Sequence, residues 1–103
     1  MKYRKKPIVI EAVQRINFDG GSIEQCFSEF PKWLEDAIEE KIVDFLRLVS
    51  PERHSHRFAI KTLEGTMDLN RGDWLIRGVK GELYPCKDEI FKMTYEKVED
   101  ENN

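Results

Sequence analysis

Residues 71–86 read RGDWLIRGVKGELYPC and carry the densest structural signal in the chain. Their pattern predicts a strand, a turn centred on Lys80 and Gly81, and a returning strand, because a glycine between apolar runs favours a hairpin. This turn places Arg77 opposite Tyr84. One face of the hairpin then carries Trp74, Ile76, Leu83 and Pro85. The other face carries Leu75, Arg77, Val79, Glu82, Tyr84 and Cys86. Neither face is cleanly polar, so we expect other parts of the chain to pack on both.

A second hairpin is predicted just before this one, over residues 58–70. A turn at Glu64 and Gly65 pairs Lys61 directly with Asp68, and the register is self-consistent because a slip of one residue would scramble both faces. The apolar face holds Phe58, Ile60, Met67 and Leu69. The polar face holds Ala59, Lys61, Thr66, Asp68 and Asn70.

The clearest helix lies earlier in the chain and begins near Pro31, which suits a first helical turn because its missing N–H has no partner there. Apolar residues recur at spacings of three and four, at Phe30, Trp33, Leu34, Ala37 and Ile38. The opposite face carries Lys32, Glu35, Asp36, Glu39, Glu40 and Lys41. Such a stripe predicts a helix packed against a sheet, with Trp33 in the core.

The remaining segments complete an α+β pattern. Residues 8–16 and 43–49 have strand character, with breaks at 19–22 and 50–52, and Ser22 with Gln25 forms a capping-box pattern for a short helix. A terminal helix is predicted to begin at Lys87 or Asp88. Its inward side would carry Ile90, Phe91, Thr94, Tyr95 and Val98.

This order of elements predicts one domain over residues 1–98, followed by a disordered acidic tail at 99–103. We expect a small, strongly bent antiparallel sheet or partial barrel packed against one amphipathic helix, with a short C-terminal helix. The length of 103 residues matches one core, since single domains typically hold about 100–150 residues.

Composition restricts the classes of partner and compartment. A net charge of −3 and a pI near 5.4 disfavour binding to duplex nucleic acid, although Lys2, Arg4, Lys5 and Lys6 make the start of the chain basic. The longest aliphatic run is residues 8–10, too short to span a membrane, and the basic start lacks the features of a secretory signal. Two distant cysteines, Cys26 and Cys86, are expected to stay reduced, which indicates a cytoplasmic protein.

Catalytic and metal-binding patterns are weak, and we expect neither a catalytic set nor a cofactor. His54 and His56 would face the same way in an extended segment, but zinc needs further ligands and the chain has no other histidine. The flanking Arg53 and Arg57 favour an exposed basic loop instead. Cys86 precedes a predicted helix start, where a thiol pKa can be lowered, yet a small buried apolar residue is the simpler interpretation.

One arrangement on the second hairpin points to binding. Arg77 and Tyr84 as cross-strand partners, with Lys80, Glu82 and Trp74 nearby, would make a flat recognition surface for a protein or for a ring with a phosphate. The alternative is a surface cation–π pair that stabilises the hairpin by about 0.5–1 kcal/mol.

The chain resembles a group of small phage and prophage proteins. The resemblance lies in the opening MKYRKKPIVIEAVQ (residues 1–14), in IKTLEGTM (60–67) and in GDWLIRGVKGELYPC (72–86). Some members are grouped under the label PGDYG, after a Pro-Gly-Asp-Tyr-Gly signature, and residues 71–75 of this chain match that signature at Gly72 and Asp73 only. The resemblance implies a phage origin and a bacterial cytoplasmic setting; it implies no reaction and no catalytic residues.

Three functions are consistent with these observations. The leading one is a non-enzymatic phage accessory protein that binds a host or phage protein or associates with itself. The second is a protein that binds or sequesters a small nucleotide signal. The third is a small thiol- or metal-dependent hydrolase, which requires Cys86, His54 and His56 to converge.

Overall fold

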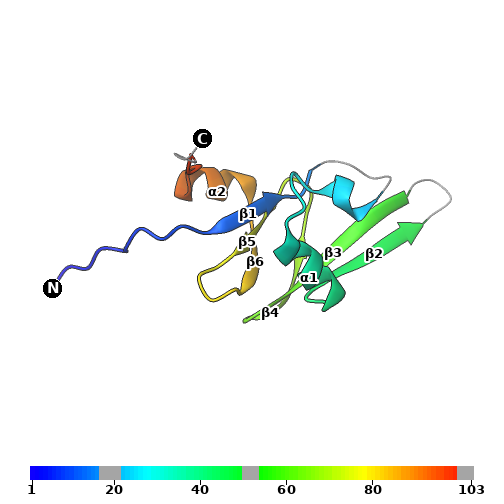
Figure 1. The fold of residues 1–103 in the computed structure, drawn as a ribbon, viewed down its shortest axis with the longest axis horizontal. Helices are drawn as coiled ribbons and strands as arrows, with labels where there is room; N and C mark the ends of the chain where they lie inside the picture. The colour runs from blue at the N-terminus through cyan, green and yellow to red at the C-terminus, as the bar shows by residue number, and fades with distance from the viewer. Residues whose placement is uncertain (17–21, 50–53, 100–103) are drawn as a thin grey trace.

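The structure is a computed structural model that describes residues 1–16, 22–49 and 54–99, without the side chains of 46–49 and 54–56 (Figure 1). Its elements run β1 (Glu11–Gln14), η1 (Ile23–Cys26), α1 (Lys32–Glu39), β2 (Val43–Val49), β3 (His54–Thr62), β4 (Gly65–Leu69), β5 (Trp74–Arg77), β6 (Leu83–Cys86) and α2 (Asp88–Thr94). This order confirms the α+β class and the short C-terminal helix. Most of the predicted break at 19–22, the turn at 50–52 and the tail beyond residue 99 lie outside the described residues.

The strands form two antiparallel sheets of three strands each, in the orders β1-β5-β6 and β2-β3-β4. The described strands do not close into a barrel. Strands β3 and β4 both contact β6, so the two sheets meet along one side and share a single core. Figure 1 shows α1 lying across β2 and β3, with α2 beside the other sheet.

The core lies between the two sheets and α1. Its buried hydrophobic residues are Val13, Cys26, Phe27, Leu34, Ala37, Val43, Phe58, Ile60, Leu69, Leu75 and Leu83. Leu34 and Ala37 come from the predicted stripe of α1, and Phe30, Trp33 and Ile38 pack against the core as half-buried residues. The prediction of an amphipathic helix packed on a sheet is therefore confirmed, with Pro31 one residue before the helix as its N-cap.

The hairpin of β3 and β4 forms with the predicted faces but not with the predicted pairs. Ile60 lies opposite Met67 and Lys61 opposite Thr66, because the loop consists of Leu63 and Glu64 rather than Glu64 and Gly65. The reason is backbone conformation: of the residues at this turn, only Gly65 has a positive φ, of 113°, so it follows the loop instead of closing it. Moving the centre of the turn by one residue shifts the cross-strand partner of each residue by two positions. Side chains alternate between the two faces of a strand, so a shift of two leaves each side chain on its predicted face.

The predicted pairing of Lys61 with Asp68 is therefore wrong. Asp68 lies opposite Ala59, and its carboxylate accepts hydrogen bonds from the Arg57 guanidinium at 3.0 to 3.3 Å. Both side chains are about half exposed, so this ion pair contributes at most about 1 kcal/mol. The segment that begins at His54 is part of strand β3 and not the predicted basic loop.

The hairpin of β5 and β6 differs from the prediction more seriously, because its two faces are exchanged along β6. Arg77 lies opposite Leu83 and Ile76 lies opposite Tyr84. The loop has three residues, 79–81, closed by a hydrogen bond from the Gly78 N–H to the Glu82 carbonyl at 2.7 Å. Within this loop only Gly81 has a positive φ, of 83°, whereas the predicted two-residue turn favours positive φ at both positions. The extra loop residue shifts the cross-strand partner of each β5 residue by one position along β6, so each β6 side chain lies on the face opposite to the predicted one.

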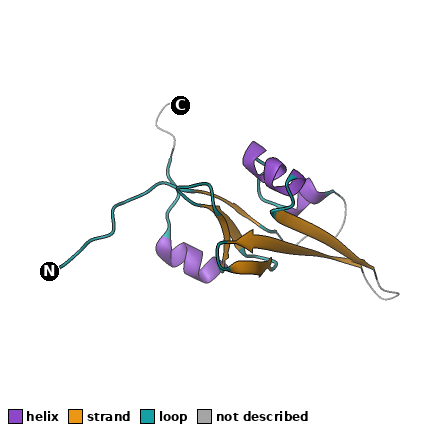
Figure 2. Ribbon diagram, turned by 90° about the horizontal axis from the view of Figure 1, so that it is seen from below, coloured by secondary structure: helices purple, strands orange, loops and turns teal. Residues whose placement is uncertain are grey.

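Both faces of this sheet are nevertheless covered, as predicted. Val13, Leu75 and Leu83 point to the core, while Ile76 is equally buried on the opposite face. Figure 2 shows α2 on the other side of the strands from α1. The lack of a polar face in the sequence of this hairpin therefore has a structural reason: the core covers one side and α2 covers the other.

Two further elements differ from the predictions. The first strand is shorter than residues 8–16, because β5, its partner, is only four residues long and ends opposite Glu11. The predicted terminal helix ends at Thr94, as α2. Phe91 on it and Tyr95 just after it are half buried, but Ile90, Thr94 and Val98 are exposed rather than inward. The capping box is confirmed, since the Ser22 N–H donates to Gln25 Oε1 at 3.0 Å.

Within the described ranges, neither α-helix has the length and apolar character needed to cross a membrane.

Candidate functional site

The five predicted site residues do not share one surface. Arg77 lies on the core side of its sheet, facing α1, whereas Tyr84 lies on the side covered by α2, because of the register of β5 and β6. The flat surface that the sequence predicted for Arg77 and Tyr84 together is therefore not formed. Each residue has a different set of neighbours.

Trp74 and Tyr84 belong to an aromatic cluster that attaches α2 to the sheet. The Trp74 ring stacks on Phe91 with centroids 4.0 Å apart and an interplanar angle of 9°. Phe91 in turn lies 5.1 Å from Tyr95, and the hydroxyl oxygens of Tyr95 and Tyr84 are 3.5 Å apart. Partial burial and then this hydrogen bond raise the pKa of Tyr84 to about 12. The cluster therefore links α2 to the β5–β6 hairpin.

Asp88 fixes the start of α2 against the same cluster. Its Oδ1 accepts a hydrogen bond from Trp74 Nε1 at 2.9 Å and a longer one from Gln14 Nε2 at 3.3 Å. Its Oδ2 lies 3.0 Å from Lys92 Nζ, one helical turn later. The Trp74 hydrogen bond and the Lys92 contact hold the pKa of Asp88 below its usual value.

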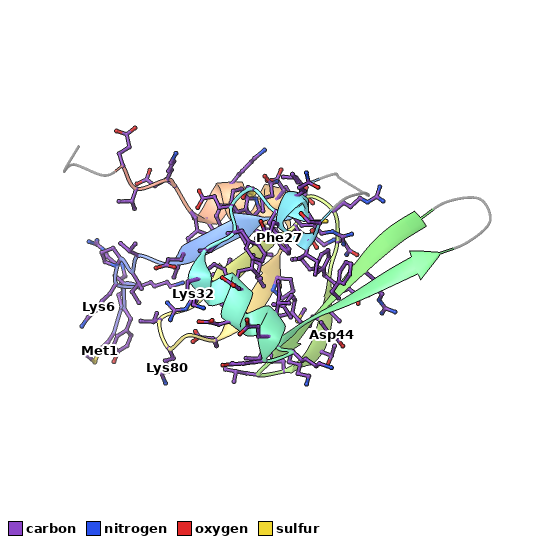
Figure 3. All side chains as sticks on the ribbon, turned by 45° about the vertical axis from the view of Figure 1, so that its right-hand side comes forward. Met1, Lys6, Phe27, Lys32, Asp44 and Lys80 are labelled. Atoms are coloured by element: carbon purple, nitrogen blue, oxygen red, sulfur yellow. The ribbon has the colours of Figure 1, made fainter. Side chains whose placement is uncertain are left out.

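Lys80 and Glu82 shape the tip of the hairpin. The backbone N–H of Lys80 donates to Glu82 Oε2 at 2.9 Å, so this carboxylate closes the loop from its side. The ammonium group of Lys80 is at the exposed tip (Figure 3). The contact between these two residues thus stabilises the three-residue loop. This loop sets the register of β5 and β6, in which the Arg77 side chain lies on the same face as Leu83.

Arg77 lines a hollow between α1 and the β5–β6 hairpin. The lining residues of this Trp33–Arg77 hollow are Trp33, Asp36, Ala37, Glu40, Ile42, Arg77, Gly81 and Leu83. It has a volume of about 180 Å³, which suits one amino-acid side chain. One wall is the helix, with an indole and two carboxylates, and the other wall is the hairpin with its guanidinium.

Two of the charged groups of the hollow, Arg77 and Glu40, form no ion pair with another described residue. Among the described residues, no carboxylate lies within ion-pair distance of Arg77, which is half buried. The third, Asp36, pairs with Lys32 at 3.0 Å in a solvent-exposed contact, and this contact raises the pKa of Lys32. Glu40 is exposed at the end of the helix.

This arrangement suits a basic peptide side chain. An indole face attracts an ammonium or guanidinium group and packs along its methylene stem. Asp36 and Glu40 would pair with the cationic head, while the Arg77 guanidinium would donate hydrogen bonds to peptide carbonyl oxygens, for which it has five N–H groups. The hollow would therefore hold a Lys or Arg of an extended segment.

Sequence reasoning singled out Arg77 as a binding residue but did not consider the helix wall of the hollow that it lines. Trp33 was assigned to the core alone, although it is half buried and lies at the margin of the stripe. Asp36 and Glu40 follow it at spacings of three and seven residues, which places all three along one line of a helix surface. That spacing was visible in the sequence; the position of the hairpin beside it was not.

A wider hollow of about 520 Å³ lies at the other end of the first sheet. It is lined by Gln14, Arg15, Ile16, Arg71 and Gly72. The Arg15 side chain is buried, donates to the Leu69 carbonyl and lies over the Phe58 ring at 4.9 Å. Arg15 thus connects this hollow to the core.

The thiol of Cys86 shows no activation. Cys86 is half buried and Cys26 is buried, and neither cysteine takes part in a disulfide. Burial and then the Asp73 carboxylate raise the pKa of Cys86, the opposite of what a nucleophile at neutral pH needs. The described residues contain no group of three or more His, Cys, Asp or Glu that could hold a metal ion, and the side chains of His54 and His56 lie outside the description.

We expect the Cys86 thiol to react with iodoacetamide more slowly than free cysteine at pH 7.5, because the thiolate is the reacting species. Mass spectrometry of labelled protein over time measures the rate. In a Cys86→Ser variant, the remaining Cys26 should be labelled only in denaturant. Faster labelling of Cys86 than of free cysteine would indicate an activated thiol and would support the hydrolase.

Comparison with known proteins finds no match: no protein-family model, no curated protein and no solved structure matches this chain.

Proposed function

We propose that this chain is a phage-encoded accessory protein that acts as a non-enzymatic binding module in the bacterial cytoplasm. Its activity would be to hold a basic, extended segment of a protein partner in the Trp33–Arg77 hollow. The observation that carries this proposal is the hollow itself, where an aromatic ring, two carboxylates and a guanidinium without an ion-pair partner among the described residues surround the volume of one side chain. The raised pKa of the Cys86 thiol also supports a binding protein rather than a thiol-dependent enzyme.

The proposal is tested with two fluorescein-labelled peptides of equal length, hexalysine and hexaglutamate, titrated into the protein and followed by fluorescence anisotropy. We expect hexalysine to bind and hexaglutamate not to bind. Glu40→Lys should weaken hexalysine binding about tenfold at low salt, which corresponds to about 1.4 kcal/mol, because it reverses one of the two charges that pair with the cation.

The matched control is Glu24→Lys, which makes the same change of charge at an exposed position on η1. If the two variants weaken binding equally, the attraction comes from net charge and not from the hollow. Equal binding of the two peptides would refute the preference for a basic segment.

A nucleotide-signal binder is the second candidate, and the hollow lined by Arg15 and Arg71 is the observation that favours it. Its volume of about 520 Å³ falls within the range of about 300–1,000 Å³ that is usual for small-molecule sites. A thermal-shift panel of cyclic and ADP-ribose-type nucleotides discriminates the two candidates, since a basic-peptide module gives no shift with any of them.

A further inference from the structure

We propose that the partner is a second copy of this chain, and that the segment it supplies is its own residues 1–10, here called the basic arm. The arm of each copy would lie across α1 of the other and place a Lys or Arg in the Trp33–Arg77 hollow. This inference rests on the proposed function, because it names the occupant of the same hollow.

The basic arm is extended and makes no regular secondary structure. Figure 1 shows it running away from the helices and strands, and Figure 3 shows Met1 and Lys6 on the arm, clear of both. Its residues are exposed except Ile10, including the apolar Tyr3 at 88% and Val9 at 74%. An exposed segment that carries an aromatic ring and β-branched residues has apolar surface to bury against another molecule.

The radius of gyration of the molecule agrees with a basic arm that extends away from the folded domain. The Cα radius of gyration is 15.2 Å, above the roughly 13 Å expected for a compact domain of about 100 residues. The arm joins β1 at Glu11, which lies opposite Arg77, the last residue of β5. Strand β5 of the same copy therefore has no further residue to pair with the arm.

Charge complementarity favours the body of this chain as the surface that the arm binds. Four of the 17 Lys and Arg residues lie in residues 1–6, which contain no Asp or Glu, so residues 7–103 hold 13 basic and 20 acidic residues, a formal charge of −7. A basic arm and an acidic body attract each other. Helix α1 and its C-cap residue contribute Glu35, Asp36, Glu39 and Glu40 to this charge.

The same charges disfavour other binding partners for the arm. Two arms paired side by side would bring eight basic residues together, and like charges on neighbouring strands are destabilising. A nucleic acid or an anionic membrane would attract the arm but would be repelled by the body. Ten extended residues reach about 33 Å, enough to cross α1, which spans about 12 Å, in another copy.

The test is the mass of the full chain by sedimentation velocity. We expect a dimer, with twice the monomer mass of 12.2 kDa, at about 0.05 M salt, and dissociation at about 1 M salt, where the Debye length falls to about 3 Å. The triple substitution of Lys2, Arg4 and Lys5 by Glu should give a monomer. The matched control replaces Lys61, Lys87 and Lys97 by Glu, an equal change of charge at exposed positions outside the arm, and should remain a dimer.

A charge swap provides a second readout. A variant with Asp36→Lys and Glu40→Lys should also be monomeric, because its basic arm meets a basic hollow. Mixed with the arm variant, it should form a heterodimer, since an acidic arm then meets a basic hollow. Misfolding of either variant cannot produce this rescue.

The inference is overturned by a wild-type monomer, by a dimer that survives the arm substitutions, or by failure of the mixed pair to associate. A wild-type monomer that still binds hexalysine in the hollow would leave the proposed function standing with a different partner. Arm-dependent binding to anionic vesicles or to duplex DNA by a monomeric chain would assign the arm to those surfaces and refute the dimer.

Discussion

Replacing Phe58 by alanine is expected to lower the free energy of unfolding by about 3–5 kcal/mol, the range for buried aromatic rings. Phe58 is fully buried on β3 and packs edge-on against Phe27, with centroids 5.1 Å apart. Phe45 lies 5.3 Å away on its other side, and the Arg15 guanidinium lies over the ring. The truncation would leave a cavity at the junction of η1, β2 and β3 and would remove the ring below a buried cation.

Urea denaturation followed by circular dichroism measures this loss. Because small domains are stable by only about 5–15 kcal/mol, the variant should show a clearly lower midpoint and a fraction of unfolded chain in buffer. The matched control is Leu63→Ala in the β3–β4 loop, where the leucine is 88% exposed; its effect should stay within about 0.5 kcal/mol. A loss below about 1 kcal/mol for Phe58→Ala would contradict the core described above.

The parts of the fold that depend on periodicity were predictable from the sequence. The stripe of α1 was identified because spacings of three and four place Leu34 and Ala37 on one side whatever the rest of the chain does. The two-sided character of the second hairpin was likewise visible, since a strand with no polar face must be covered on both sides. Local rules were sufficient for both features.

Register was not predictable, because it depends on the backbone conformation of single loop residues. Both hairpins contain an Xaa-Gly pair that suggests a two-residue turn, yet Gly65 follows its loop and Gly81 is the last of three loop residues. In the first hairpin the error preserved the faces. In the second it exchanged them along β6 and moved Tyr84 away from Arg77.

At the candidate site, too, local features were predictable from the sequence and contacts between distant segments were not. The sequence singled out Arg77 as a binding residue beside Tyr84, and the structure places it in the hollow with other neighbours. Trp33, Asp36 and Glu40 reach it from a helix more than 35 residues earlier in the chain. Contacts between distant segments follow from the packing of α1 against both sheets, and no local pattern in the sequence specifies that packing.

Trp74→Ala should have the second-largest effect, a loss of about 2–3 kcal/mol, below the range of about 3–5 for fully buried rings because Trp74 is half exposed. The substitution removes the stack on Phe91 and the hydrogen bond to Asp88. Since these contacts attach α2 to the sheet, the helix should open locally before the rest of the domain.

Amide hydrogen exchange within α2 measures that opening. The N–H groups of Phe91 and Tyr95 donate to the carbonyls of Lys87 and Phe91 at 2.8 Å, and both should exchange faster in Trp74→Ala while core amides of β3 change less. Met93→Ala is the matched control on the same helix, because that side chain is 87% exposed. Unchanged exchange at Phe91 and Tyr95 would show that Trp74 does not hold the helix.

Trp74→Phe separates the ring from its N–H group, because phenylalanine can still stack on Phe91 but cannot donate to Asp88. The pKa of Asp88, which the Trp74 hydrogen bond lowers first and Lys92 second, should rise toward its ordinary value, as measured by NMR titration of the carboxyl carbon. A depressed pKa in the folded state stabilises the protein above the unfolded pKa, and this contribution disappears as the pH falls through the folded value. Wild type should therefore lose more stability than Trp74→Phe on acidification. An Asp88 pKa that stays low in Trp74→Phe would instead assign the shift to Lys92.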